Sequence, residues 1–189
     1  MKNKILFPIL AAAIPLMGDG CATNAHYVQT GGSENIVSVG QINIQDYIQA
    51  ANDMTGKLLA SGALDRVATP PAVLAISRIV NNTGQQIDTD LLTKKIRVAV
   101  LDSGKAMTTT TMGLGGTAED PMAKGFQQNI RPPDFTLSGK IIQLTARAGD
   151  TRQSTYSFQL SLTDAKTGLA VWEGEKEITK QGTRSSVGF

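Results

Sequence analysis

Residues 154–163 have the sequence STYSFQLSLT, which shows the clearest strand pattern in the chain. Large apolar residues occupy every second position, and serine, threonine and glutamine fill most of the positions between them. This period of two predicts an antiparallel strand with one buried face and one polar face. The turn sequence DAKTG, residues 164–168, then leads to a predicted last strand at 169–178, which contains Trp172 and Ile178.

A further strand is predicted just before this pair, at residues 134–146, and it completes a three-strand meander. The alternation of its apolar residues slips between Ile141 and Ile142, and such a slip predicts a β-bulge. The polar stretch RAGDTRQ, residues 147–153, is predicted to be the hairpin loop. In the strand predicted at 134–146, Phe135, Leu137 and Ile141 are expected to lie on one face.

Residues 43–60 predict an amphipathic helix, because their apolar side chains recur at spacings of three and four. Gly62 and then Pro70-Pro71 end this segment. We expect its apolar stripe to pack on the domain, and the alternative is a helix that binds a partner. The next segment, AVLAISRIV at 72–80, predicts a strand buried on both faces. The apolar stripe of the helix predicted at 43–60 consists of Ile44, Tyr47, Ile48, Ala51, Met54, Leu58 and Leu59.

A second helix is predicted to begin after a cap at Asp88 or Thr89 and to end at Gly104. Threonine-rich residues 105–112 predict another strand, and residues 119–128 a short helix. The elements together define an α+β fold, with a small mixed or antiparallel sheet of about four to five strands and packed helices. The predicted domains are a globular domain at 42–183 and a C-terminal tail at 184–189.

Residues 1–20 have the pattern of a secretory signal peptide, with two lysines before a short apolar stretch and small residues before Cys21. Cys21 is the only cysteine, so it cannot form an internal disulfide. A solitary exposed thiol is a liability in an oxidising compartment. We therefore expect Cys21 to be the first mature residue and to carry a lipid. The alternative is an ordinary cleaved signal that leaves a free thiol.

Residues 21–41 are predicted to form a flexible lipidated tether, because small and polar residues and a Gly-Gly pair dominate them. About 20 extended residues reach at most ~70 Å. The chain carries a formal net charge of +2, and loss of the signal peptide, with two lysines and one aspartate, makes it +1. This near-neutral balance, with 5% aromatic residues, argues against a nucleic-acid partner.

No arrangement of residues with catalytic or metal-binding chemistry is found in the sequence. The single histidine, His26, lies in the predicted tether, so no site of paired histidines can form. The Lys166-Thr167-Gly168 triad matches one β-lactamase element, but its Ser-x-x-Lys partner is missing, so a turn is the better interpretation. Glu173, Glu175 and Glu177 share one strand face, which we interpret as solvated. We expect a binding module that is not an enzyme and needs no cofactor or metal.

Three blocks of the sequence resemble the LpoB family in order and spacing. They are residues 80–106 (VNNTGQQIDTDLLTKKIRVAVLDSGKA), 134–141 (DFTLSGKI) and 156–181 (YSFQLSLTDAKTGLAVWEGEKEITKQ). The resemblance implies an outer-membrane lipoprotein that faces the periplasm and activates a class A penicillin-binding protein, a bifunctional peptidoglycan synthase. It implies non-covalent activation of both glycan polymerisation and peptide crosslinking.

The matched blocks do not locate the surface that docks on the synthase. Arg78, Arg147 and Arg152 are candidate partner contacts because arginine is enriched at interfaces, and the alternative is that they are ordinary solvated charges. A second functional hypothesis is a lipoprotein that assembles into an envelope or secretion complex, like the curli-export lipoproteins. That function requires membrane-inserting strands of alternating apolar residues, and the sequence has no such pair to spare.

Overall fold

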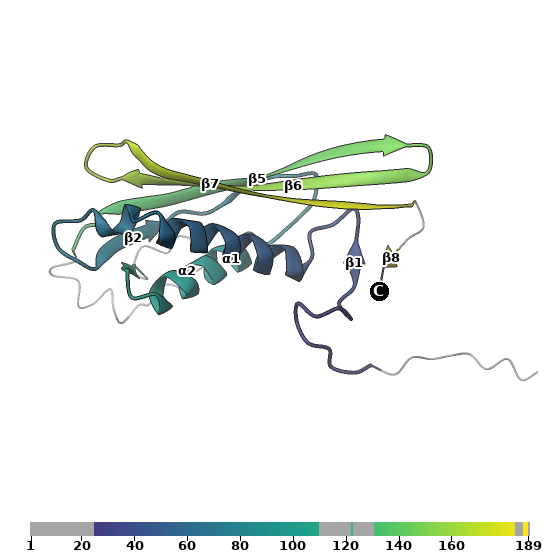
Figure 1. The fold of residues 1–189 in the computed structure, drawn as a ribbon, viewed down its shortest axis with the longest axis horizontal. Coiled ribbons are helices and arrows are strands. Elements are labelled where there is room, and N and C mark those ends of the chain that lie inside the picture. Colours follow the sequence, from purple (N-terminus) through teal and green to yellow (C-terminus); the bar gives the residue numbers. More distant parts are fainter. Residues whose placement is uncertain (1–24, 110–121, 123–130, 184–186, 189) are drawn as a thin grey trace, which may run out of the picture.

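Two helices pack on one face of a six-stranded mixed sheet in the described part of the computed structural model (Figure 1). The structure describes residues 25–109, 122, 131–183 and 187–188. The helices are α1 (Ile44–Ala60) and α2 (Asp90–Asp102). The strands of the sheet are β2 (Ala72–Ile76), β3 (Val80–Asn82), β4 (Ala106–Thr108), β5 (Phe135–Ala148), β6 (Thr151–Asp164) and β7 (Ala170–Thr183).

The strand order is β4-β2-β5-β6-β7, with β3 pairing β5 beside β2. The pairs of β2 with β4 and β5 are parallel, and those of β6 with β5 and β7 are antiparallel. A 3₁₀ turn (Ala63–Asp65) follows α1, and a separate two-stranded ladder joins β1 (Val37–Ser38) to β8 (Val187–Gly188). The predicted α+β fold with a mixed sheet is confirmed. The sheet gains a strand because residues 72–80 divide into β2 and β3 at Ser77–Ile79.

The alternation of β6 places its large apolar side chains beneath the helices, as predicted. Tyr156, Phe158, Leu160 and Leu162 are all at most 2% exposed. The Tyr47 ring of α1 meets Phe158 edge to face, with 6.3 Å between the ring centroids. The amphipathic stripe of α1 is therefore part of the core, and the alternative of a free helix for a partner is wrong.

The α2 prediction is also confirmed, with Thr89 at the N-cap and Gly104, at φ +68°, just past the end. The Asp88 carboxylate accepts a hydrogen bond from the Asp90 N–H at 2.8 Å. Strand β4 ends at Thr108, so it is shorter than predicted among the described residues. The short helix predicted at 119–128 falls outside the described residues, apart from Met122, which is helical.

The predicted bulge in β5 is wrong, because β5 and β6 pair without interruption from Phe135↔Asp164 to Ala148↔Thr151. Ile141 faces the helices, whereas Ile142 belongs to the opposite face. The apolar pattern slips because Ile142 and Leu144 are apolar residues on the face away from the helices, where Leu144 is 61% exposed. The register shift in this meander lies instead between Leu162 and Thr163, where β6 pairs β7.

The predicted seven-residue hairpin loop is also wrong. Gly149 and Asp150 alone form the turn, and Gly149 has the left-handed φ of +56° that glycine tolerates best. Both strands of the hairpin continue past the N-terminal end of α1 (Figure 1). Their side chains in this extension are polar or small because no helix covers them.

Lys180 of β7 forms the one ion pair in the described residues whose two side chains are both buried. Its partner is Asp46 in the first turn of α1, and both side chains are 7% exposed. The same Asp46 carboxylate accepts a hydrogen bond from the Asn43 N–H at 2.7 Å, which helps to cap α1. The pair therefore joins the last long strand of the sheet to the start of the first helix.

Lys180→Ala should destabilise the protein by about 3–5 kcal/mol, because it leaves Asp46 charged and buried without its cation. Lys57→Ala is the matched control, since Lys57 forms an exposed pair with Asp53 at 2.8 Å. That change should cost about 0.3–0.5 kcal/mol. Urea unfolding curves of the three proteins test the difference, and equal midpoints for the two variants would contradict it.

Gly139→Ala should destabilise the protein by about 1–3 kcal/mol, because a Cβ there would lie 2.5 Å from the Gln159 carbonyl oxygen and 2.7 Å from Leu160 Cδ2. Gly56→Ala should instead stabilise α1 by about 0.5–1 kcal/mol, since no atom outside the backbone of its own helix and its chain neighbours lies within 4 Å of that Cβ position. Thermal or urea unfolding compares the two alanines. Shifts of the same sign would contradict the described β5–β6 pairing.

Candidate partner-binding surfaces

Residues 38–43, which we call the N-terminal strap, are bound to the domain by Gln85 in the β3–α2 loop. Gln85 Nε2 donates to the Gly40 carbonyl oxygen at 2.5 Å, and Gln85 Oε1 accepts from the Ile42 N–H at 3.1 Å. Gln85 Nε2 also lies 2.7 Å from the Tyr156 hydroxyl oxygen of β6. Gln85 thus bonds both a carbonyl oxygen and an N–H group of the strap, and its contact with Tyr156 ties the strap to the sheet.

Lys180 binds the strap from the other side. Its ammonium group donates to the Gln41 carbonyl oxygen at 2.6 Å, to Asn43 Oδ1 at 2.5 Å and, more weakly, to the Ser38 carbonyl oxygen at 3.4 Å. It also lies 5.6 Å from the centroid of the Tyr156 ring. The charge of Lys180 is therefore satisfied by Asp46 and the strap together, and residues 38–41 are held by the domain.

Two of the three predicted contact residues come together at the β5–β6 hairpin end. Arg147 and Arg152 lie directly opposite each other in the strand register, and both are exposed. The Arg152 guanidinium also packs beside Gly40 of the strap, with Nη1 3.5 Å from the position of a Cβ on that glycine. Like charges opposite each other on a strand pair are unfavourable. This end of the domain therefore carries two exposed positive charges on facing positions of the hairpin.

The other predicted site residues lie elsewhere. Arg78 is in the β2–β3 connection, where its side chain is 78% exposed and lies 4.0 Å from the Asp90 carboxylate. The structure does not bring it to the hairpin end. Cys21 is outside the described residues.

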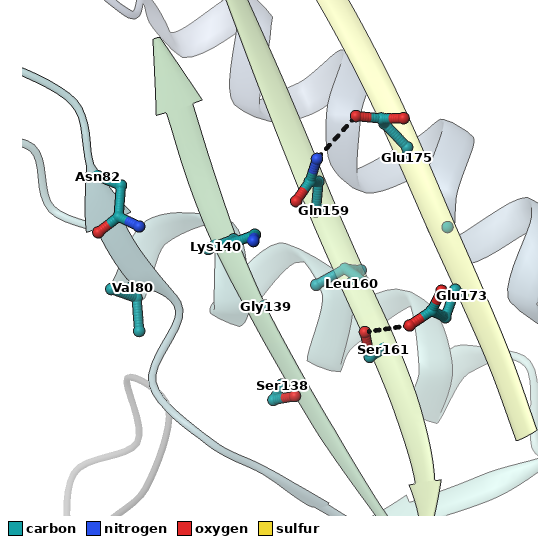
Figure 2. Close-up of a pocket in the computed structure, with 11 residues that line it drawn as sticks. Val80, Asn82, Ser138, Gly139, Lys140, Gln159, Leu160, Ser161, Glu173 and Glu175 are labelled. Carbon is teal, nitrogen blue, oxygen red and sulfur yellow. Dashed lines mark hydrogen bonds between the residues drawn. The ribbon is translucent and has the colours of Figure 1, made fainter. Parts of the chain in front are cut away.

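The sheet face opposite the helices carries a shallow polar trough with a volume of about 710 Å³ (Figure 2). Val80 and Asn82 of β3 lie on one side of it, and Glu173 and Glu175 of β7 lie on the other. Between them lie polar side chains of β5 and β6, which are Ser138, Lys140, Gln159 and Ser161. The trough is open and lacks aromatic side chains, so it offers hydrogen bonds and charge.

Glu173 and Glu175 are held over β6 by hydrogen bonds. Glu175 Oε1 accepts from Ser157 Oγ at 2.5 Å and from Gln159 Nε2 at 2.8 Å, and Glu173 Oε1 accepts from Ser161 Oγ at 3.2 Å. The hydrogen bonds from Ser157 and Gln159 lower the pKa of Glu175 below its usual value. A carboxylate that is held ionised in this way is a poor general acid.

Metal chemistry finds no support in the described residues, since they contain no group of three or more His, Cys, Asp and Glu side chains placed to hold an ion. No helix within the described ranges is long and apolar enough to cross a membrane. The Lys166-Thr167-Gly168 triad forms the β6–β7 turn. There Asp164 Oδ1 accepts from the Lys166 and Thr167 N–H groups at 2.9 and 2.8 Å.

The sequence interpretation missed the residues that hold the strap. Asn43 followed three residues later by Asp46 has the spacing of a capping box and marks where α1 begins. Lys180 shares the face of Ile178 by period two, so strand parity places it on the helix side of β7. Gln85 had no such signal, because its role depends on Tyr156, which is distant in the sequence.

The sequence matches the family model described as "Peptidoglycan-synthase activator LpoB" over residues 46–129 and 115–178, which together cover more than half of the chain. The chain therefore belongs to the LpoB family, a family of peptidoglycan-synthase activators.

Solved structures with a similar fold include two of this family. The LpoB C-terminal domain from Escherichia coli is 18% identical, with 71% of this chain and 99% of that chain covered and a TM-score of 0.46. The corresponding domain from Salmonella enterica is 17% identical, with 70% and 98% covered and a TM-score of 0.44. Lipoprotein GNA1162 from Neisseria meningitidis is 16% identical, with 61% and 88% covered and a TM-score of 0.40. A comparison with curated protein sequences finds no significant match.

The stability of the domain should fall as the pH rises from about 10 to 12. Burial raises the pKa of Tyr47 to about 12, with smaller contributions from the Asp88 and Asp46 carboxylates, and burial also raises the pKa of Tyr156. An unfolded tyrosine titrates near pH 10. Between the two values the folded state holds a proton that the unfolded state has lost, so the free energy of unfolding decreases with pH.

Urea unfolding at pH 9 and at pH 11.5 measures this decrease. The comparison is made for the unmodified protein and for Tyr47→Phe, in which the ring remains but the ionisable group is absent. The variant should lose less stability between the two pH values. An equal loss in both proteins would contradict the proposed contribution of Tyr47.

Proposed function

We propose that this chain is a lipid-anchored, non-enzymatic activator that binds a class A penicillin-binding protein and promotes glycan polymerisation and crosslinking. The observation that carries this proposal is the family match, which begins in α1 and continues to Ile178 in β7.

The proposed anchor is a lipid on Cys21, which would place the domain at the outer membrane, facing the periplasm. The strap contacts imply that the flexible tether is shorter than residues 21–41, because Gln85 and Lys180 hold residues 38–43. Residues 21–37 lie before the strap, and even fully extended these 17 residues reach at most ~60 Å. The synthase must therefore present its docking surface within that distance of the membrane.

The hairpin end with Arg147 and Arg152 is the proposed docking surface for the synthase. The hairpin extends beyond α1 (Figure 1), and both arginines are exposed, so a partner can reach their guanidinium groups. Docking activates the enzyme if the active conformation of the synthase binds the hairpin better than the resting one does. A difference of about 1–3 kcal/mol in binding would favour the active conformation roughly 5- to 150-fold.

The activation claim is tested with purified residues 22–189 and the class A penicillin-binding protein of the same organism. The rate of glycan-strand synthesis from lipid-linked precursor should rise with activator concentration and saturate. No change in rate, together with no binding by calorimetry, would remove the activator claim. Precursor consumption without synthase would show that the chain is itself an enzyme.

Arg147→Ala/Arg152→Ala should weaken synthase binding at least tenfold without lowering stability, because the change removes both proposed contacts and also their mutual repulsion. Lys94→Ala/Lys166→Ala is the matched control, since it removes the same charge from exposed positions away from the hairpin end. Calorimetry measures both affinities. Equal weakening by the two double variants would show a general charge effect and would remove the hairpin as the docking surface.

Cys21→Ser in the full-length precursor should release the protein from membranes into the soluble periplasmic fraction, since a serine oxygen cannot replace the sulfur as the site of lipid attachment. Fractionation and mass spectrometry of the mature N-terminus provide the measurement. A serine variant that remains with the outer membrane would contradict lipidation at Cys21.

A further inference from the structure

Strand β7 is a long free edge of the sheet. It has 14 residues and pairs with β6 alone, and no backbone hydrogen bond in the described residues crosses its other side. Exposed edges are usually short or blocked, because their unpaired N–H and C=O groups accept another strand. The middle of β7 therefore presents a row of backbone groups to which an extended segment can pair.

The open face of this edge carries negative charge. Glu173, Glu175 and Glu177 are exposed and lie opposite Ser161, Gln159 and Ser157 of β6, which are all neutral. None of the ion pairs between described residues involves these glutamates. Lys176 and Lys180 belong to the helix-side face, where Lys180 binds Asp46.

The helix-side face of the same edge carries two large apolar side chains, Trp172 and Ile178, with Gly174 and Lys176 between them. Trp172 and Ile178 are only partly buried and pack against the core. The Trp172 indole lies over Gly174, so close that a Cβ on this glycine would overlap the ring. An added strand would therefore meet carboxylates on one face, and Trp172 and Ile178 on either side of Lys176 on the other.

We propose that β7 between Trp172 and Ile178 binds an extended segment of a protein partner in which lysine or arginine alternates with apolar residues. Cross-strand neighbours on one face lie about 4.5–5.5 Å apart, so the basic side chains would pair with Glu173, Glu175 and Glu177. The apolar side chains would cover Trp172 and Ile178. Backbone hydrogen bonds supply affinity in this mode, and the alternating side chains supply specificity.

The same charges disfavour a second copy of the chain as the occupant. Two β7 edges paired antiparallel would bring the two rows of glutamates together on one face, and like charges on neighbouring strands are destabilising. The edge therefore selects a basic partner over self-association. This surface lies along the side of the sheet and is separate from the hairpin end with Arg147 and Arg152.

The probe for this site is a blocked ten-residue peptide that alternates lysine with valine, titrated into residues 22–189 by calorimetry. The peptide should bind with a dissociation constant below about 1 mM, and added salt should weaken the binding. Amide exchange followed by NMR should show new protection in β7 between residues 172 and 178. A peptide with the same composition in shuffled order should bind at least tenfold more weakly, since its lysines no longer share one face.

The matched variants are Glu173→Gln/Glu175→Gln/Glu177→Gln, which keeps the side-chain shape, and Glu34→Gln, which neutralises an exposed glutamate elsewhere. The triple variant should bind the alternating peptide about tenfold more weakly, and Glu34→Gln should bind it like the unmodified protein. The absence of binding, equal binding of the shuffled peptide, protection outside β7 or an unaffected triple variant would each overturn the proposal. Synthase activation is measured separately, so its failure would not be confused with failure at this edge.

Discussion

The buried ion pair between Lys180 and Asp46 is the constraint on which the described architecture depends. A buried charge is tolerated only when its partner and its hydrogen bonds are all in place. Lys180 meets this requirement with Asp46, the Asn43 amide oxygen and the strap carbonyl of Gln41. The end of β7, the start of α1 and the entry of the N-terminal segment therefore have to assemble together.

This assembly gives the sheet two different surfaces. One face is filled by α1 and α2, and the other presents the polar trough of Figure 2. The hairpin end and the β7 edge both carry exposed charges that form no ion pair with another described residue. A protein that regulates an enzyme by binding it needs such surfaces on a rigid support, and membership of the LpoB family accords with this arrangement.

Strand parity and helix periodicity predicted much of the fold, because both are local properties. The core positions of β6 and the stripe of α1 follow from spacing alone. The hairpin loop was predicted wrongly because residues of β5 and β6 beyond the helices are polar, and polar strands resemble loops in a sequence. The bulge was predicted because the apolar pattern changes parity at Ile142, but Ile142 and Leu144 are simply apolar residues on the other face of an unbroken strand. The proximity of Arg147 to Arg152 could not be predicted, since it requires a register that depends on a two-residue turn.

Hydrogen–deuterium exchange of the chain alone and bound to the peptidoglycan synthase that it is proposed to activate tests the central claim most directly. The account predicts that the synthase protects residues 144–153 at the β5–β6 hairpin end, while exchange around Asp46 and Lys180 stays slow in both states. The account would be contradicted if protection were confined to other elements. It would also be contradicted if the amide hydrogens of strap residues 38–43 exchanged faster on binding, because the domain would then not be preformed.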